Sequence, residues 1–195
     1  MFSRFFKETV AAAMALLSLN CVAQTDDFAC TTATLRGTYG FKIHADLLGI
    51  LTGTAPSQTL HRLANAGVID AVALATFDGF GGGHQKDFGM LNGTRTPGEP
   101  PLEFETDETL TYTLSGDCSG QMQIIYPGGK TITTEIVVLD RGKQMYGVVS
   151  AFHSSPSPIT ALDGTSCSKG CDFGIQTGTM AVRVDGEGGR GPRGQ

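Results

Sequence analysis

Short segments in which apolar and polar residues alternate dominate this chain. The clearest of them runs from Leu35 to His44. Its apolar set is Leu35, Tyr39, Phe41 and Ile43, and its polar set is Arg36, Thr38, Lys42 and His44. A two-residue period places successive side chains on opposite faces of a strand, so the apolar set is expected on a buried face. The segment therefore predicts a half-buried β-strand.

Similar segments recur along the chain, with turn-forming residues between them. Strands are expected at 68–77, 85–91, 103–106, 109–114, 122–126, 131–139, 144–152 and 178–184. Asp78-Gly79 and Asn92-Gly93 are typical of tight hairpin turns. The run 68–77 is apolar on both faces apart from Asp70 and Thr76, which predicts a central strand covered twice.

This pattern predicts an all-β fold. Eight or nine strands at short spacing favour an antiparallel barrel of about eight strands, with a β-sandwich as the alternative. One helix is expected to interrupt the strands. Ser57 to Asn65 carries Leu60, Leu63 and Ala64 at helical spacing, with Gly67 as a stop. This short helix is expected to cap one end of the barrel.

Residues 1–23 are predicted to be a secretory signal peptide. Arg4 and Lys7 form a basic start, an apolar run covers residues 10–19, and Ala23 ends a suitable cleavage site. The apolar run is shorter than the about 20 residues that span a bilayer. No transmembrane segment is therefore expected.

The protein is accordingly expected to be secreted, either outside the cell or into a periplasm. Lipoprotein anchoring through Cys21 is the less favoured alternative, because Asn20 stands where a small residue is expected. Residues 24–184 are expected to form a single β-barrel domain, since the 172 residues left after cleavage suit one domain. Residues 185–195 have no apolar residue to bury and predict a flexible glycine-rich tail.

The charge balance excludes some classes of partner. The full chain has a net charge of −5, and loss of Arg4, Lys7 and Glu8 with the signal makes it −6. This acidic balance argues against nucleic acid, whose phosphates call for a basic patch. It equally argues against an anionic membrane surface. The sequence leaves the oligomeric state open.

Four cysteines remain after the predicted cleavage, namely Cys30, Cys118, Cys167 and Cys171. An even number in an exported chain indicates two disulfides, and four cysteines allow three pairings. We favour Cys30 with Cys118, which ties the start of the domain to its middle, and Cys167 with Cys171, which closes a small loop. No histidine lies at a zinc-binding spacing from them, so neither a metal nor another cofactor is expected.

The glycine-rich run and the histidines give little support for a catalytic motif. Residues 78–84 are followed by strand-like alternation and not by the helix that a phosphate cradle needs, so a hairpin turn is favoured. The four histidines have no histidine partner at i+2 or i+4, and His61 is the one that could face a cavity mouth. Asn92-Gly93-Thr94 fits a glycosylation acceptor and equally a type I′ turn.

Acidic residues crowd the segment from Glu99 to Glu108. Glu103 and Glu105 share a predicted strand face and could act as an acid–base pair, although a solvated strand edge is the commoner reason for such charge. Calcium also binds such oxygens, but the spacing of an EF-hand is absent. No catalytic residue is assigned.

Three segments together resemble one known architecture. They are Leu35 to Phe41 (LRGTYGF), Thr76 to Gly82 (TFDGFGG) and Asp117 to Gly120 (DCSG). In this order they resemble small exported proteins with an allene oxide cyclase-like barrel, over roughly residues 30–152 and the last strand. The resemblance implies an eight-stranded barrel with an apolar interior. Relatives of that architecture cyclise reactive apolar molecules by shaping them inside the barrel, but no catalytic residue of theirs matches a position here.

We therefore expect the protein to bind a small apolar molecule in the barrel interior. The expected lining is Tyr39, Phe41, Phe77, Phe88, Tyr112 and Tyr126. The small side chains of Ala71, Ala73 and Ala75 would leave room for the ligand beside these rings. Alternatively, they only allow the strand to pack closely against its neighbours and leave no such room. Two alternatives stay open. One is a cyclase or isomerase aided by a tyrosine or a carboxylate, and the other is a non-catalytic extracellular structural or interaction domain.

Overall fold

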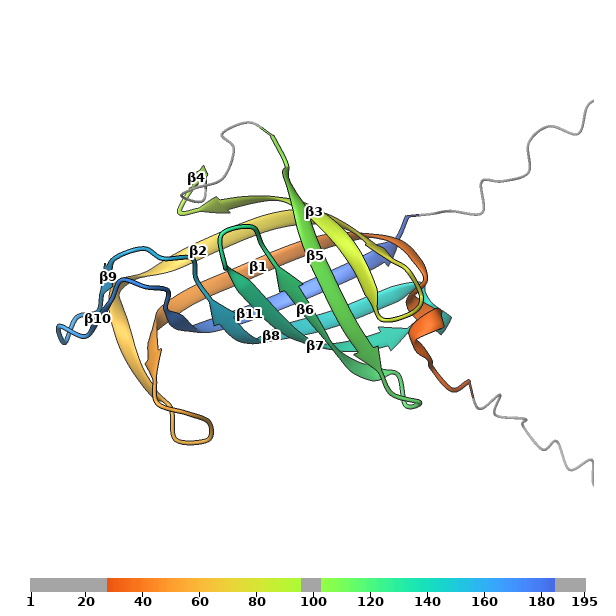
Figure 1. The fold of residues 1–195 in the computed structure, drawn as a ribbon, viewed down its shortest axis with the longest axis horizontal. Helices are drawn as coiled ribbons and strands as arrows, with labels where there is room; N and C mark the ends of the chain where they lie inside the picture. Colours follow the sequence, from red (N-terminus) through yellow and green to blue (C-terminus); the bar gives the residue numbers. More distant parts are fainter. Residues whose placement is uncertain (1–27, 96–102, 185–195) are drawn as a thin grey trace, which may run out of the picture.

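The computed structural model describes residues 28–95 and 103–184, which are built around one large antiparallel sheet (Figure 1). Its long strands are β1 (Gly37–Thr52), β2 (Thr59–Phe77), β3 (Gly82–Leu91), β5 (Glu105–Leu114), β6 (Ser119–Ile125), β7 (Thr131–Leu139), β8 (Gln144–His153) and β11 (Asp172–Arg183). The short elements are the 3₁₀ turns η1 (Thr32–Leu35) and η2 (Asp140–Gly142) and the strands β4 (Thr94–Arg95), β9 (Ile159–Thr160) and β10 (Ser166–Cys167). The predicted signal peptide, with Cys21, and the predicted tail lie outside the described residues.

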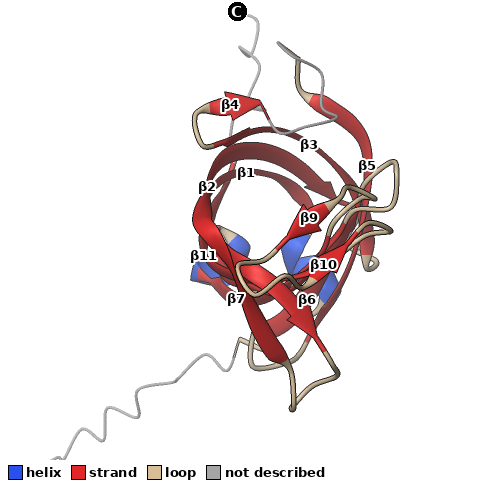
Figure 2. Cartoon of the chain, turned by 90° about the vertical axis from the view of Figure 1, so that its left-hand side faces the viewer, coloured by secondary structure: helices blue, strands red, loops and turns tan. Residues whose placement is uncertain are grey.

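The sheet closes on itself. Its strand order is β2-β1-β11-β8-β7-β6-β5-β3-β4, and β2 also pairs with β3 along the length from Ile69 to Phe77. Figure 2 looks into the resulting ring, in which β4 is only a short attachment to β3. The predicted antiparallel barrel of about eight strands is confirmed. Closure gives every long strand two neighbours, although the part of β2 before Ile69 pairs with β1 alone.

The predicted helix at Ser57–Asn65 is wrong. Residues from Thr59 onward belong to β2 and pair with β1 in a long hairpin. The register slips between Leu47 and Gly49 of β1, and residues 63–66 bulge out of the pairing. Extra residues at a bulge interrupt the two-residue period, so the leucines of this segment imitate helical spacing in the sequence. Pairing with β1 overrides that weak local preference.

A large apolar core fills the end of the barrel where β1 begins. It consists of Leu35, Tyr39, Phe41, Ala73, Ala75, Phe77, Leu110, Tyr112, Met122, Ile124, Tyr126, Ile136, Val138, Met145 and Ala181. The rings of Tyr39, Phe77 and Tyr112 meet edge to face, with centroids 5.3 and 5.1 Å apart. The turn η1 covers this end, since Leu35 is fully buried and the Tyr112 hydroxyl donates to the Thr32 carbonyl at 2.9 Å.

A smaller core lies at the other end, where β1 finishes. Its buried members are Leu47, Ile50, Ala161, Cys171 and Phe173. Residues 159–171, which contain the hairpin β9–β10 and are called the cap below, supply part of this core (Figure 2). The cap is tied to β2, because the Leu162 amide donates to the Arg62 carbonyl at 2.9 Å and His61 is bonded to Asp163 at 2.7 Å.

The outward faces of the strands are not covered. Val68 and Val72 of β2 are 39% and 48% exposed, so the prediction of a strand covered on both faces is wrong. The reason is that helical structure in the described ranges is limited to η1 and η2, which form no layer over the barrel. Neither turn has the length or the apolar content to cross a membrane.

Both expected disulfides are formed. Cys30–Cys118 joins the segment before η1 to the turn between β5 and β6, across 88 residues of sequence. Cys167–Cys171 lies within the cap and spans four residues. The first disulfide therefore connects distant parts of the barrel, whereas the second constrains only a local loop.

Removal of the Cys30–Cys118 disulfide should cost more stability than removal of Cys167–Cys171. In the chain-entropy account, the 88-residue link restricts the unfolded chain by about 4 to 5 kcal/mol and the four-residue link by about 2 kcal/mol. Urea unfolding of the two double Cys→Ser variants, compared with the unaltered oxidised chain, measures both losses. Equal losses, or a larger loss for the cap disulfide, would contradict this account.

Candidate functional site

A cavity of about 100 Å³ lies inside the barrel between the two cores. Its wall is mostly apolar and is formed by Ile43, Ala45, Ile69, Ala71, Gly89, Ile132, Val149, Phe152, Ile175 and Thr177, with Asp87, Tyr126 and Lys130. The last three residues give the cavity one polar end. Small residues on β2 and β3 make this space, because Ala71 and Gly89 are register partners and both line it.

A larger hollow of about 580 Å³ lies on the outside of the barrel, over β5 to β8. Its acidic residue, Glu135, already accepts hydrogen bonds from Gln121 at 2.8 Å and from Ser150 at 3.0 Å. The acidic group of the outer hollow is thus already hydrogen-bonded, and it lies at an open surface. The interior cavity instead adjoins buried ionisable groups, and for this reason we take it as the candidate site.

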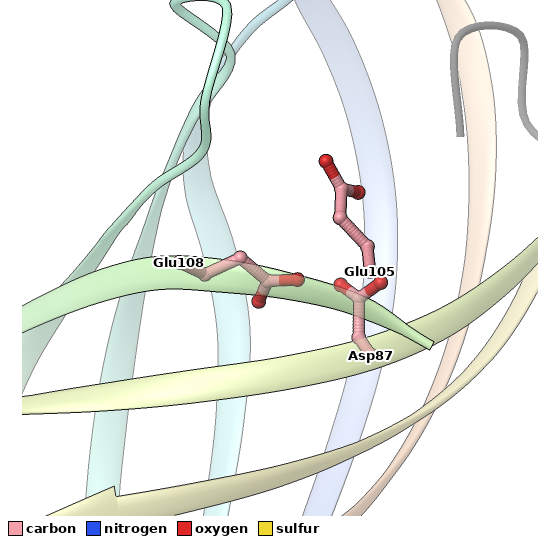
Figure 3. A group of neighbouring side chains, drawn as sticks. All are labelled: Asp87, Glu105 and Glu108. Carbon is pink, nitrogen blue, oxygen red and sulfur yellow. The ribbon is translucent and has the colours of Figure 1, made fainter. Parts of the chain in front are cut away.

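Three carboxylates gather at the polar end of the cavity (Figure 3). Asp87 lies on β3, and Glu105 and Glu108 lie on β5. One carboxylate oxygen from each residue lies within 4.8 Å of the others. Figure 3 shows the Glu108 carboxylate directed toward Asp87.

A β-bulge explains how two glutamates three positions apart both reach this cluster. Gln85 pairs with Glu108 and Asp87 pairs with Glu105. Between these two pairs β5 therefore contains one more residue than β3. The backbone of Asp107 takes a left-handed conformation there, with φ of 69°. A regular strand would point residues 105 and 108 to opposite faces, but the extra residue restores the same face.

Glu108 is fully buried at 0% exposure. Gln85 donates its side-chain amide to Glu108 Oε2 at 2.8 Å, while Glu108 Oε1 has no hydrogen-bond partner among residues 28–95 and 103–184. Burial and, to a smaller extent, the neighbouring Asp87 charge together raise the pKa of this carboxyl from 4.5 to about 8. Glu108 is therefore protonated at neutral pH.

The other two carboxylates have cationic or hydroxyl neighbours. The Tyr126 hydroxyl donates to Asp87 Oδ2 at 2.6 Å. The Lys130 ammonium lies 3.5 Å from Glu105 Oε2 and 3.5 Å from the centre of the Tyr126 ring. Burial, followed by the negative charges of Asp87 and Glu108, raises the pKa of Tyr126 well above its usual value. Tyr126 is thus a lasting hydrogen-bond donor at this end of the cavity.

Most of the predicted aromatic lining lies elsewhere. Four of the six residues belong to the large core and do not line the cavity, namely Tyr39, Phe41, Phe77 and Tyr112. Tyr126 does line it. Phe88 lies outside the barrel wall, where it packs against the Arg95 guanidinium at 3.9 Å and the Phe104 ring at 5.9 Å. The placement of Phe88 in the interior is therefore wrong, because β3 turns Gln85 and Asp87 inward.

The sequence reasoning missed Asp87, Glu108 and Lys130 as members of one site. Of the two alternatives for Glu103 and Glu105, the acid–base pair is wrong, because Glu103 is exposed to solvent ahead of β5 while Glu105 lies beside Asp87 and Glu108. Asp87 carried a usable signal, since a charged residue in a strand can mark an inward polar position. His61 does not line the described cavity, and its ring instead bonds Asp163 and the Thr52 hydroxyl.

Replacement of the buried acid should change how stability depends on pH. Between pH 4.5 and about 8 the folded protein holds a proton on Glu108 that the unfolded chain has lost, so stability falls as pH rises through this window. The whole fall is at most about 5 kcal/mol. Glu108→Gln should remove it and should be the more stable protein above pH 8.

Thermal unfolding of both proteins across this pH range tests the expectation. Glu103→Gln, an exposed acid next to the same strand, serves as the matched control and should follow the unaltered chain. Identical pH courses for Glu108→Gln and the unaltered protein would show that Glu108 is not held in its protonated form.

Comparisons with protein-family models, with curated proteins and with solved structures found no match. The resemblance to allene oxide cyclase-like barrels consequently stays a prediction. What this site can do chemically is therefore inferred from the positions and contacts of its own residues.

Proposed function

We propose that this protein binds a small, mainly apolar molecule in the barrel interior. The observation that carries the proposal is the cavity itself, which has an apolar wall and one polar end formed by Asp87, Tyr126 and Lys130. A concave apolar site with a few converging polar groups, one of them beside a carboxyl of shifted pKa, is the usual form of a ligand site. The two alternative functions, a cyclase or isomerase and a non-catalytic extracellular structural or interaction domain, stay predictions from the sequence.

The size of the cavity limits the ligand. Its volume of about 100 Å³ is smaller than the about 150 Å³ of an apolar cavity that accepts benzene. It is also well below the about 300 Å³ at which drug-sized sites begin. The proposed ligand is therefore a molecule of few heavy atoms.

The polar end favours a ligand that donates a hydrogen bond. Asp87 offers carboxylate oxygens next to the cavity, and Tyr126 already directs its hydroxyl to Asp87 Oδ2. A ligand hydroxyl or amine can add a donor to this group, while the rest of the ligand contacts the alkyl and aromatic walls. Such a ligand gains apolar burial and one oriented polar contact.

We also propose that the protein works in an exported, oxidising compartment. Cys30–Cys118 and Cys167–Cys171 support this, because disulfides persist mainly outside the reducing cytosol. The predicted signal peptide agrees with this location.

Filling the cavity should abolish binding. Ala71 lines the cavity and Val72 beside it faces solvent, so Ala71→Leu and Val72→Leu form a matched pair. Short alcohols from propanol to cyclopentanol serve as probes, and stabilisation should grow by about 0.8 kcal/mol per buried CH₂ until the space is full. Binding is read from the rise in melting temperature and from chemical shifts of cavity methyl groups.

Ala71→Leu should lose this response by at least about tenfold in affinity, while Val72→Leu should keep it. A response that is absent in the unaltered protein, or equal in both variants, would refute binding in the interior. Native mass spectrometry of protein purified from its own host would reveal a ligand already bound.

A further inference from the structure

The carboxylate cluster brings three acidic side chains within reach of one another inside the barrel. Asp87, Glu105 and Glu108 together offer three carboxylates, and Lys130 is the ammonium that lies against them. We propose that this cluster is a binding site for a hard divalent cation of the calcium type. The proposal does not rest on the apolar ligand, because the cation would sit among the carboxylates and not in the apolar space.

The spacing of the oxygens fits calcium. Calcium binds carboxylate oxygens at about 2.3 to 2.6 Å, so oxygens on opposite sides of the ion lie about 5 Å apart. One oxygen from each of the three residues lies within 4.8 Å of the other two. Magnesium needs oxygens at about 2.1 Å in strict octahedral geometry, which demands a tighter set. The cluster is therefore better suited to the larger ion.

Glu108 supplies an independent indication of a missing partner. Its side chain is fully buried, and Oε1 has no hydrogen-bond partner in the part of the chain that the structure describes, although Oε2 is bonded to Gln85 at 2.8 Å. A buried polar atom without a partner costs free energy. The Glu108 carboxylate is directed into the cluster (Figure 3), so an ion held there would satisfy Oε1.

The donors come from two neighbouring strands and not from one loop. Asp87 belongs to β3, and the β5 bulge at Asp107 brings Glu105 and Glu108 to the same face. Each residue offers one oxygen to the shared space, so the protein supplies three ligand atoms and water would complete the about six to eight that calcium takes. This arrangement has no fixed spacing in the sequence, which is why a search for an EF-hand pattern does not find it.

Lys130 is the natural competitor of the ion. Its ammonium lies 3.5 Å from Glu105 Oε2, and its side chain is 16% exposed. A divalent ion among the carboxylates would repel this ammonium, and the flexible side chain can withdraw toward solvent. Loss of the Lys130 charge should therefore strengthen ion binding.

Isothermal titration of the disulfide-intact chain with CaCl₂, in buffer freed of other divalent ions, tests the proposal. We expect one calcium per chain, bound more tightly than magnesium in a parallel titration. Glu108→Gln and Asp87→Asn should weaken binding by at least about tenfold. The exposed Glu103→Gln is the matched control and should bind as the unaltered chain does.

The variant Lys130→Met distinguishes a calcium site that the Lys130 ammonium blocks from a cluster that does not bind calcium at all. This variant should bind calcium at least severalfold more tightly than the unaltered chain. Failure of both the unaltered protein and Lys130→Met to bind calcium would overturn the proposal, as would equal binding by Glu108→Gln. Magnesium binding as tight as calcium binding would overturn the calcium-type assignment. Circular dichroism confirms that each variant is folded.

The cavity-filling variant Ala71→Leu keeps this test distinct from the proposed function. It should retain calcium binding while losing the alcohol probes. If Ala71→Leu lost calcium binding as well, the ion would depend on the apolar cavity. This result would refute its location among the carboxylates.

Discussion

Pairing between β2 and β3 is the constraint on which the rest of the structure depends. It joins the two ends of a curved sheet over nine register pairs, from Ile69↔Leu91 to Phe77↔Gly83. Once the ring is closed, every side chain of a long strand must point either to the interior or to the outside. The interior of a barrel of this size is just wide enough for side chains to fill it or for one small ligand. The identity of the inward residues then decides where the barrel is solid and where it is hollow.

The inward residues change character along the barrel axis. Aromatic and long aliphatic side chains fill the end near η1, and Phe77 meets the rings of Tyr39 and Tyr112 there. Alanine and glycine stand opposite each other farther along, at Ala71 and Gly89, and the packed core gives way to the cavity. Carboxylates occupy the boundary between these regions. Burial of a carboxylate costs free energy unless the group has partners. Residues that lower stability in this way are typical of functional sites.

The strands, the turns and both disulfides could be predicted from the sequence, because alternation and turn chemistry are local properties. Leu35 to His44 shows this well, since β1 turns Tyr39, Phe41 and Ile43 inward, while Leu35 is buried from η1. The helix at residues 57–65 was predicted wrongly because a bulge in β2 imitates helical spacing. The site escaped prediction for a related reason. Phe88 was placed inside on the assumption that apolar residues face inward, but β3 instead turns Asp87 into the barrel. The meeting of Glu105 and Glu108 depends on the Asp107 bulge and its pairing with β3, which no local pattern encodes.

The two ends of the barrel are closed by different kinds of bond. Near η1, the Cys30–Cys118 link joins segments 88 residues apart, so that end cannot open without distorting the barrel wall. At the cap, the Cys167–Cys171 link only shapes a loop, and the cap is held by packing in the smaller core and by bonds such as Leu162 to Arg62 and Asp163 to His61. Hydrogen bonds at a surface break and reform in local fluctuations far smaller than global unfolding. The cap, which no long-range covalent link holds to the barrel, is therefore the end at which local fluctuations are expected to expose the interior first.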